Sequence, residues 1–310
     1  MRFELNILGC GSATPTARHN PSSQIVNFRD KLFMIDCGEG AQVMMKRMGL
    51  KFSRLSHIFI SHLHGDHCFG LPGLLSTMSL HEKGGSVTVH LPRGGRAILE
   101  PMIRYFCDNT SYELRFEEHP ARPGVIYQDS ALTVETFPLY HRVPCSGFIF
   151  REAEPLLNLR GDMVKFHQVP VSAMHSIKCG EDFVKPDGTV VPNALLTLPR
   201  KPAVSYAYCS DTMADPRVTE AVRGVDVIYH EATYADDQAQ KARQRGHSTA
   251  REAGITAREA GARQLIIGHY SKRYADVTPL LQEAREEFPH VIAADEGQCL
   301  DLRALAADPK

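Results

Sequence analysis

Several features are scarce or missing in this sequence of 310 residues. Basic and acidic side chains nearly balance, and the formal net charge of −1 leaves no global basic character. A nucleic-acid partner would therefore need local basic patches or bound metal ions. No stretch approaches the roughly 18 apolar residues of a membrane-spanning helix, and the first residues lack the apolar run of a secretory signal. We therefore expect a soluble cytoplasmic protein with no membrane partner.

The eight cysteines are scattered, and none forms a Cys-x-x-Cys pair. This spacing argues against a cysteine-based zinc knuckle, and a chain of this length needs no disulfide scaffold. Cys68 and Cys209 stand beside histidine- and aspartate-containing segments. We interpret both as reduced, buried packing residues, the usual state of a free cysteine.

Apolar periodicity and glycine stops predict strands and helices in turn along most of the chain. The predicted strands are 3–9, 23–28, 31–35, 55–61, 87–91, 112–118, 132–139, 204–209, 225–229, 265–269 and 291–302. The predicted helices are 40–48, 71–82, 96–107, 215–222, 248–260 with Ser248 as its cap, and 279–288. Interleaved strands and helices predict a layered α/β fold.

The pattern weakens between residues 152 and 201. This stretch holds five prolines and the turn signal Asp187-Gly188. We interpret it as an inserted arm or a long hairpin outside the main core.

The densest cluster of chemically active side chains is the run His62-Leu63-His64-Gly65-Asp66-His67. It follows a predicted strand and precedes a predicted helix. Residues 62 and 64 of a strand point to one face, and Gly65 permits a sharp turn that redirects the two residues after it. Three imidazoles and a carboxylate without a thiolate suit zinc, or a harder ion such as manganese.

One segment cannot complete two metal sites, so further ligands must come from distant parts of the chain. His141, Asp211 and His269 each stand where a predicted strand ends. Strand ends of layered α/β folds gather along one edge, where active sites usually open. Taken singly, each of these residues could equally be an ordinary surface or core residue.

The histidine run resembles the signature of the metallo-β-lactamase superfamily. Its longer context resembles the ribonuclease Z family, the tRNA 3′-processing endonucleases, in their short form. The stretches that carry this resemblance are Phe59 to Leu75, Leu8 to Ser12, Ile35 to Gly40, Ser210 to Thr212, His230 to Thr233, Gly246 to Thr249 and Gly268 to Tyr274. The resemblance implies one four-layer αβ/βα domain over 1–310, with 152–201 as an inserted arm that binds tRNA.

The resemblance also implies a ligand set for two Zn²⁺ ions per subunit, with Mn²⁺ as an alternative. His62, His64 and His141 would hold the first ion. Asp66, His67 and His269 would hold the second, and Asp211 would bridge the two.

The implied reaction cleaves the 3′ trailer from precursor tRNA and leaves a 3′-hydroxyl on the tRNA and a 5′-phosphate on the trailer. Asp66 would orient the attacking water or accept its proton, and His247 would protonate the departing oxygen with Glu231 as its orienting carboxylate. His247 could instead merely precede a helix. Asp36 is expected to stabilise a turn near the site and is not proposed as a ligand.

Two other kinds of protein stay open as alternatives. One is a metallo-β-lactamase-fold hydrolase of small substrates, such as a phosphodiesterase, and the other is a tRNA- or metal-binding protein without turnover. The family implies a homodimer. The chain departs from the family in its arm tip, which lacks a Gly-Pro pair, and in Ala17 and His19, where lysine and arginine are frequent. Candidate contacts to an RNA backbone are Lys46, Arg47, Lys51, Arg54, Lys272 and Arg273.

Overall fold

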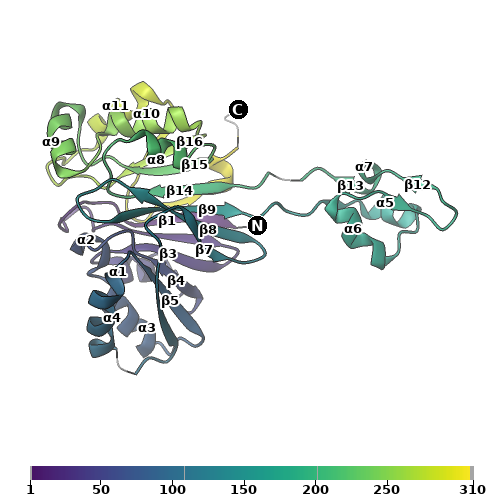
Figure 1. Ribbon diagram of the computed structural model, residues 1–310, viewed down its shortest axis with the longest axis horizontal. Coiled ribbons are helices and arrows are strands. Elements are labelled where there is room, and N and C mark those ends of the chain that lie inside the picture. The colour runs from purple at the N-terminus through teal and green to yellow at the C-terminus, as the bar shows by residue number, and fades with distance from the viewer. Residues whose placement is uncertain (1, 108, 201, 308–310) are drawn as a thin grey trace. The chain divides into compact units, whose positions relative to one another are not determined.

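The computed structural model describes residues 2–107, 109–200 and 202–307, and the chain divides into two compact units. The larger unit consists of Met1–Gln128, Thr133–Phe150 and Val204–Lys310, and the smaller one of Asp129–Leu132 and Arg151–Ala203. Figure 1 labels the helices and strands of both units.

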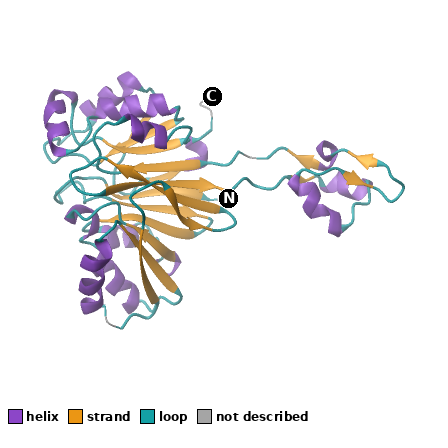
Figure 2. Ribbon diagram, in the orientation of Figure 1, coloured by secondary structure: helices purple, strands orange, loops and turns teal. Residues whose placement is uncertain are grey.

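The larger unit is built on two seven-stranded sheets, drawn in orange in Figure 2. The first sheet has the spatial order β18 (Cys299–Asp301), β1 (Phe3–Gly9), β2 (Ser23–Phe28), β3 (Lys31–Cys37), β4 (Leu55–Phe59), β5 (Ser86–Leu91) and β6 (Glu113–Glu118). Strands β3 to β6 run parallel to one another. Their carboxyl ends therefore lie at one edge of the sheet, which is where the histidine run begins.

The second sheet has the spatial order β17 (Val291–Ala293), β16 (Gln264–Gly268), β15 (Val227–Glu231), β14 (Ser205–Cys209), β9 (Cys145–Glu152), β8 (Leu132–Leu139) and β7 (Gly124–Gln128). Strands β14 to β17 are parallel. All residues of β14 and β15 are buried, as expected of parallel strands that are covered on both faces.

Helices cover the outer face of each sheet (Figure 1). Beside the first sheet lie α1 (Ala41–Arg47), α2 (Gly65–Cys68), α3 (Leu71–Leu80) and α4 (Gly95–Phe106), with α12 (Leu302–Leu305) next to β1. Beside the second sheet lie α8 (Pro216–Ala221), α9 (Ala239–Arg245), α10 (Ala250–Ala260) and α11 (Thr278–Glu287). The order helix, sheet, sheet, helix confirms the predicted four-layer fold. Within the described residues, no helix is long and apolar enough to cross a membrane.

Aromatic side chains fill the space between the two sheets. Phe59 of β4 contacts Phe148 and Phe150 of β9, with ring centroids 5.5 and 5.7 Å apart. Phe33 of β3 meets Phe150 edge to face at 6.1 Å. Such contacts are worth about 0.5–1.5 kcal/mol each beyond the burial of their area. They set the separation between the first sheet, through β3 and β4, and the second sheet, through β9.

The smaller unit contains the segment 152–201 and has a hydrophobic core of its own. Its elements are β10 (Asn158–Leu159), α5 (Gly161–Phe166), α6 (Met174–Cys179), β11 (Phe183–Val184), β12 (Val190–Val191), α7 (Asn193–Leu196) and β13 (Thr197–Leu198). Val169, Ile177, Phe183, Val191 and Leu196 are buried together at its centre. The unit is therefore a small folded body in which β11 and β12 form a short hairpin and the paired strands β10 and β13 lie near its two chain ends.

The sequence-based boundaries differ from the structure at a few points. The predicted strand 291–302 is two short strands in different sheets, β17 and β18. The cap of α10 is Thr249, whose hydroxyl accepts the amide hydrogen of Glu252 in a capping box. The hydroxyl of Ser248 instead donates to the carbonyl of Thr212, 2.7 Å away, so the prediction of Ser248 as the cap was wrong.

One buried carboxylate connects the sheets. Asp36 in β3 accepts hydrogen bonds from the backbone amide and hydroxyl of Ser61, at 2.7 and 2.8 Å, and from the hydroxyl of Tyr208 in β14, at 2.8 Å. The ring of His67 also lies 2.7 Å from the same carboxylate. Asp36 has a positive φ of 54°, which aspartate tolerates better than most residues. These four contacts join β3, the end of β4, α2 and β14.

We predict that Tyr208→Phe lowers the free energy of unfolding by about 1.5–3 kcal/mol, because the buried Asp36 carboxylate loses one donor. Denaturant titration of the wild type and the variant measures the difference. Tyr229→Phe is the matched control, since Tyr229 stacks on Tyr208 at 5.1 Å and contributes no hydrogen bond to Asp36. Equal losses in the two variants would contradict the role assigned to Asp36.

Candidate metal centre and active site

The histidine run begins where β4 ends and continues into α2. His62 and His64 lie in extended chain, and α2 starts at Gly65, so Asp66 and His67 occupy its first turn. A side chain at residue 65 would collide with the ring of Phe69, because a Cβ there would come within 2.3 Å of it. The absence of a side chain at Gly65 therefore leaves room for the Phe69 ring, and the change from extended chain to α2 places the His67 ring beside that of His62, with centroids 4.1 Å apart.

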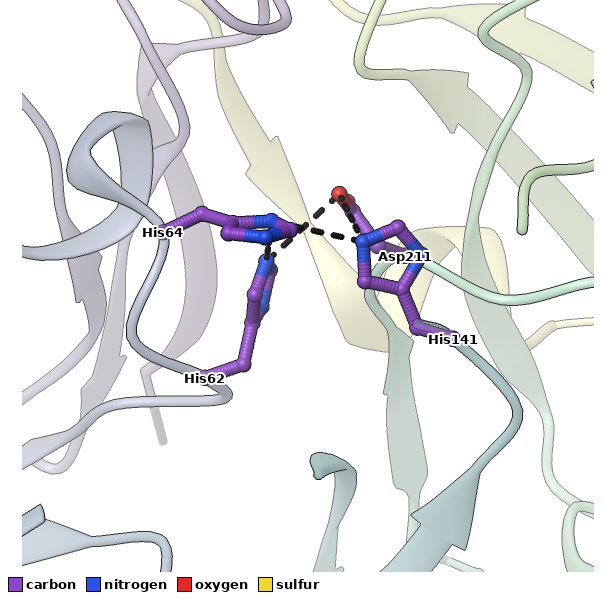
Figure 3. Close-up of side chains that lie close together, drawn as sticks. All are labelled: His62, His64, His141 and Asp211. Carbon is purple, nitrogen blue, oxygen red and sulfur yellow. Dashed lines mark hydrogen bonds and ion pairs between the residues drawn. The ribbon is translucent and has the colours of Figure 1, made fainter. Parts of the chain in front are cut away.

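The first cluster unites His62, His64, His141 and Asp211 (Figure 3). The Nδ1 atom of His64 lies 3.0 Å from Nε2 of His62 and 3.3 Å from Nε2 of His141. The Oδ2 atom of Asp211 lies 3.6 and 3.8 Å from those two Nε2 atoms. Three ring nitrogens and a carboxylate oxygen thus face one common point, which suits a divalent metal ion.

The second cluster consists of Asp66, His67 and His269. The Nε2 atoms of His67 and His269 are 3.3 Å apart, and Oδ2 of Asp66 lies 3.6 Å from each. The other oxygen of Asp211, Oδ1, lies 3.1 Å from Nε2 of His269 and 3.5 Å from that of His67. Asp211 therefore faces both clusters, one oxygen to each.

Two observations show that these residues fit metal ions. Within the described residues, the buried Oδ1 atom of Asp211 has no hydrogen-bond partner, and such an orphan is costly unless a cation or a proton satisfies it. In addition, burial favours neutral His67, but the Asp211, Asp36 and Asp66 carboxylates outweigh it and raise the pKa of His67 to about 10. A divalent cation would neutralise this concentration of negative charge.

The ring nitrogen that faces away from each cluster is anchored by a neighbour. His141 Nδ1 lies 2.6 Å from the carbonyl of Gly246, and His67 Nδ1 lies 2.7 Å from Asp36. His269 Nδ1 lies 2.8 Å from the hydroxyl of Thr233, and His269 itself has a positive φ of 60°. Such contacts orient the imidazoles toward a shared centre.

His247 and Glu231 form a buried pair beside the clusters. Nδ1 of His247 is 2.9 Å from Oε1 of Glu231 and 3.9 Å from Oδ2 of Asp211. Glu231 also accepts hydrogen bonds from the amide of Thr212, at 2.8 Å, and from the hydroxyl of Thr233. Burial disfavours a charged imidazole, but the Glu231 carboxylate outweighs it and raises the pKa of His247 to about 9.

The clusters open into a cavity of about 370 Å³. Its lining includes His64, Asp66, Asp211, His247 and His269 together with the loop residues Ser12, Ala13 and Thr14. The backbone amide of Ala13 donates to Oδ2 of Asp66 at 2.6 Å. The loop 12–14 thus forms one wall of the cavity and orients one of the candidate ligands.

The structure brings together every residue that the sequence suggested as a ligand or a catalytic group. The sequence analysis missed the contacts of Asp36 and Thr233 with the ligand imidazoles, and it missed Arg142 and Arg245, which line the cavity. Of the candidate RNA contacts, Lys272 lines this cavity, whereas Arg47, Lys51 and Arg54 line a different one of about 530 Å³.

Known proteins resemble the chain over nearly its whole length. A protein named ribonuclease Z from Bacteroides fragilis is 51% identical over 302 residues, which cover 97% of this chain and 99% of the relative. A ribonuclease Z from Porphyromonas gingivalis is 46% identical over 301 residues, with coverage of 97% and 99%. A family model described as anti-Pycsar protein Apyc1 matches residues 3–174.

Solved structures with the same fold are more distant in sequence. The short form of human tRNase Z (ELAC1) superposes with a TM-score of 0.69 at 22% identity and covers 96% of this chain and 99% of that one. The metallo-β-lactamase fold protein YhfI from Bacillus subtilis gives a TM-score of 0.67 at 18% identity, with coverage of 96% and 99%. The chain therefore belongs to the ribonuclease Z family, has the metallo-β-lactamase fold, and over residues 3–174 also belongs to the family that the Apyc1 model describes.

Proposed function

We propose that this chain is a metal-dependent endoribonuclease that removes the 3′ trailer from precursor tRNA. One observation carries the proposal: in a member of the ribonuclease Z family, seven candidate ligands form two adjacent clusters that share Asp211. Two metal sites side by side suit the hydrolysis of a phosphodiester, because together they stabilise charge on both the attacking and the leaving oxygen.

We assign the ligands as the two clusters suggest. His62, His64 and His141 would hold one Zn²⁺, and Asp66, His67 and His269 would hold a second, with Asp211 between them. Mn²⁺ is an alternative, since nitrogen and oxygen donors accept it as well. When bound, the two ions would supply a nucleophilic water at neutral pH and neutralise charge on the phosphate.

The protein's own groups would then handle the protons. Asp66 lines the cavity, and the amide of Ala13 holds its Oδ2 atom in place, so Asp66 can orient the attacking water and accept its proton. Glu231 holds Nδ1 of His247 and leaves the Nε2 atom of that ring to protonate the departing 3′ oxygen. Cleavage of the bond between phosphorus and this oxygen yields a 3′-hydroxyl on the tRNA and a 5′-phosphate on the trailer.

The smaller unit is the proposed tRNA-binding arm, within residues 152–201. It has its own core, and it exposes Phe166 and Val171 to three quarters or more of their area. Residues 158–193 contain four basic and four acidic side chains. The net charge of this segment would therefore contribute little to its affinity for RNA. A homodimer and a cytoplasmic location remain predictions from the sequence.

The proposed activity is tested by incubating the purified protein with a precursor tRNA that carries a 3′ trailer, with and without a chelator. We expect one discrete cut after the discriminator base, lost with the chelator and restored by Zn²⁺ or Mn²⁺. Brisk hydrolysis of a small phosphodiester without any cut in the precursor would instead favour a small-substrate phosphodiesterase.

For the ligand assignment, we predict that His141→Ala loses about one equivalent of zinc and at least about a hundredfold in activity. Substitution of a residue that only contacts a metal ligand already lowers metal affinity or activity by about 10–100-fold. Metal content per chain and the rate of precursor cleavage are the measurements. His290→Ala serves as the control, because His290 is exposed and does not line the cavity. Full metal content in His141→Ala would show that the assignment is wrong.

For the proton donor, we predict that His247→Ala keeps both metal ions and lowers kcat by about 10²–10⁴-fold, the usual contribution of a general acid. Glu231→Gln should lower kcat by a smaller factor. The glutamine amide oxygen still contacts the His247 ring, so only the stabilisation by the negative charge is lost. Metal analysis accompanies single-turnover kinetics. Loss of metal from His247→Ala would make this residue a ligand or a structural group instead.

A further inference from the structure

The metal-site cavity has three cationic side chains in its lining. Arg142, Arg245 and Lys272 line it, and all three are exposed. In the part of the chain that the structure describes, none of the three has a carboxylate within ion-pair distance. Other exposed arginines are paired, for example Arg217 with Asp215 at 2.8 Å. We call these three residues the cationic rim.

The segments that carry the two arginines of the rim touch each other. His141 Nδ1 contacts the carbonyl of Gly246 at 2.6 Å, which joins the loop after β8 to the end of α9. Gly246 has a positive φ of 75°, which glycine adopts without strain, and a Cβ atom there would lie 2.9 Å from Nδ1 of His141 and 3.3 Å from the Arg142 side chain. The same contact that orients a candidate metal ligand therefore brings the loop that carries Arg142 beside the end of α9, where Arg245 is the last helical residue.

The charges around the cavity indicate what the rim binds. The carboxylates that line the cavity are Asp66 and Asp211, and both belong to the metal clusters. With divalent cations bound there, the centre is already positive, and three more unpaired cations around it repel one another. Such an arrangement suits a ligand with several negative charges. A small phosphodiester has one, which the metal centre itself would neutralise.

We propose that the cationic rim binds phosphates of the RNA that neighbour the scissile phosphodiester. This inference rests on the proposed endoribonuclease activity and extends it to substrate positioning. Arginine contacts a phosphate through two parallel N–H donors, and lysine contacts it as a point charge. Contacts to neighbouring phosphates set the register of the strand without reading its sequence. They place one particular phosphodiester over the metal centre.

Binding tests this proposal without requiring turnover. The probe is a fluorescently labelled RNA minihelix with a 3′ extension, in which a methylene phosphonate replaces the scissile linkage. Its affinity for the full-length, metal-loaded protein is measured by anisotropy at several salt concentrations. We expect Arg142→Ala and Arg245→Ala each to weaken binding about tenfold. Each should also reduce the slope of log affinity against log salt by about 0.7.

Arg243→Ala is the matched control. Arg243 lies on α9 two residues before Arg245, is exposed, and does not line the metal-site cavity. The metal content and the circular dichroism spectrum should be equal in all variants, which shows that the metal centre and the fold are intact. Affinities and salt slopes of Arg142→Ala and Arg245→Ala equal to those of Arg243→Ala would overturn the proposal.

The endoribonuclease activity and the role of the cationic rim are tested by different results. If the wild type binds the minihelix through the rim but does not cut the unmodified RNA, the proposed endoribonuclease activity is refuted and the rim is supported as an RNA contact. If the wild type cuts precursor tRNA and the rim variants bind and cut like the control, the activity stands and the rim has no part in it.

Discussion

The buried carboxylate of Asp36 is the contact on which the remainder of the site depends. It is fully enclosed and has hydrogen-bond partners in the segment after β4, in α2 and in β14. A buried charge is tolerated only when it is well satisfied, so these partners must keep their positions. Ser61 contacts both Asp36 and the His62 ring, 3.0 Å away. The position of the metal clusters is therefore coupled to the packing of one sheet on the other.

The clusters themselves follow from strand ends. His62, His141, Asp211 and His269 come from four separate loops, each shortly after a strand. Because the aromatic layer between the sheets holds the strands at a defined separation, these loops meet over one edge of the sandwich. The positions of these loops are therefore coupled to the packing of the two sheets. Such a constraint gives the preorganised geometry that a hydrolytic centre needs.

Much of this arrangement could be predicted from local patterns. Strands 3–9 and 132–139 were predicted at their observed bounds, and the histidine run indicated the metal centre. The strand β9 was missed because nearly all of its residues are buried, so it shows no alternation. Ser248 was predicted as the cap of α10 in place of Thr249, although the three-residue spacing from Thr249 to Glu252 marks the true cap. The partners of Asp36 and the placement of Arg142 beside Arg245 depend on contacts between distant segments, which no local pattern carries.

The independent core of the smaller unit has an evolutionary consequence. Val169, Ile177 and Phe183 stabilise that unit from within, and none of its residues belongs to the metal clusters. Substitutions on its surface can therefore accumulate under their own selection, while the catalytic layers stay constrained by packing. With the proposed role of the smaller unit as the tRNA-binding arm, such a chain can be retargeted to a different RNA, or can adapt to altered tRNA partners, without any change in its chemistry. The absent Gly-Pro tip and the balanced charge of this segment are the kind of variation that such a division of the chain permits.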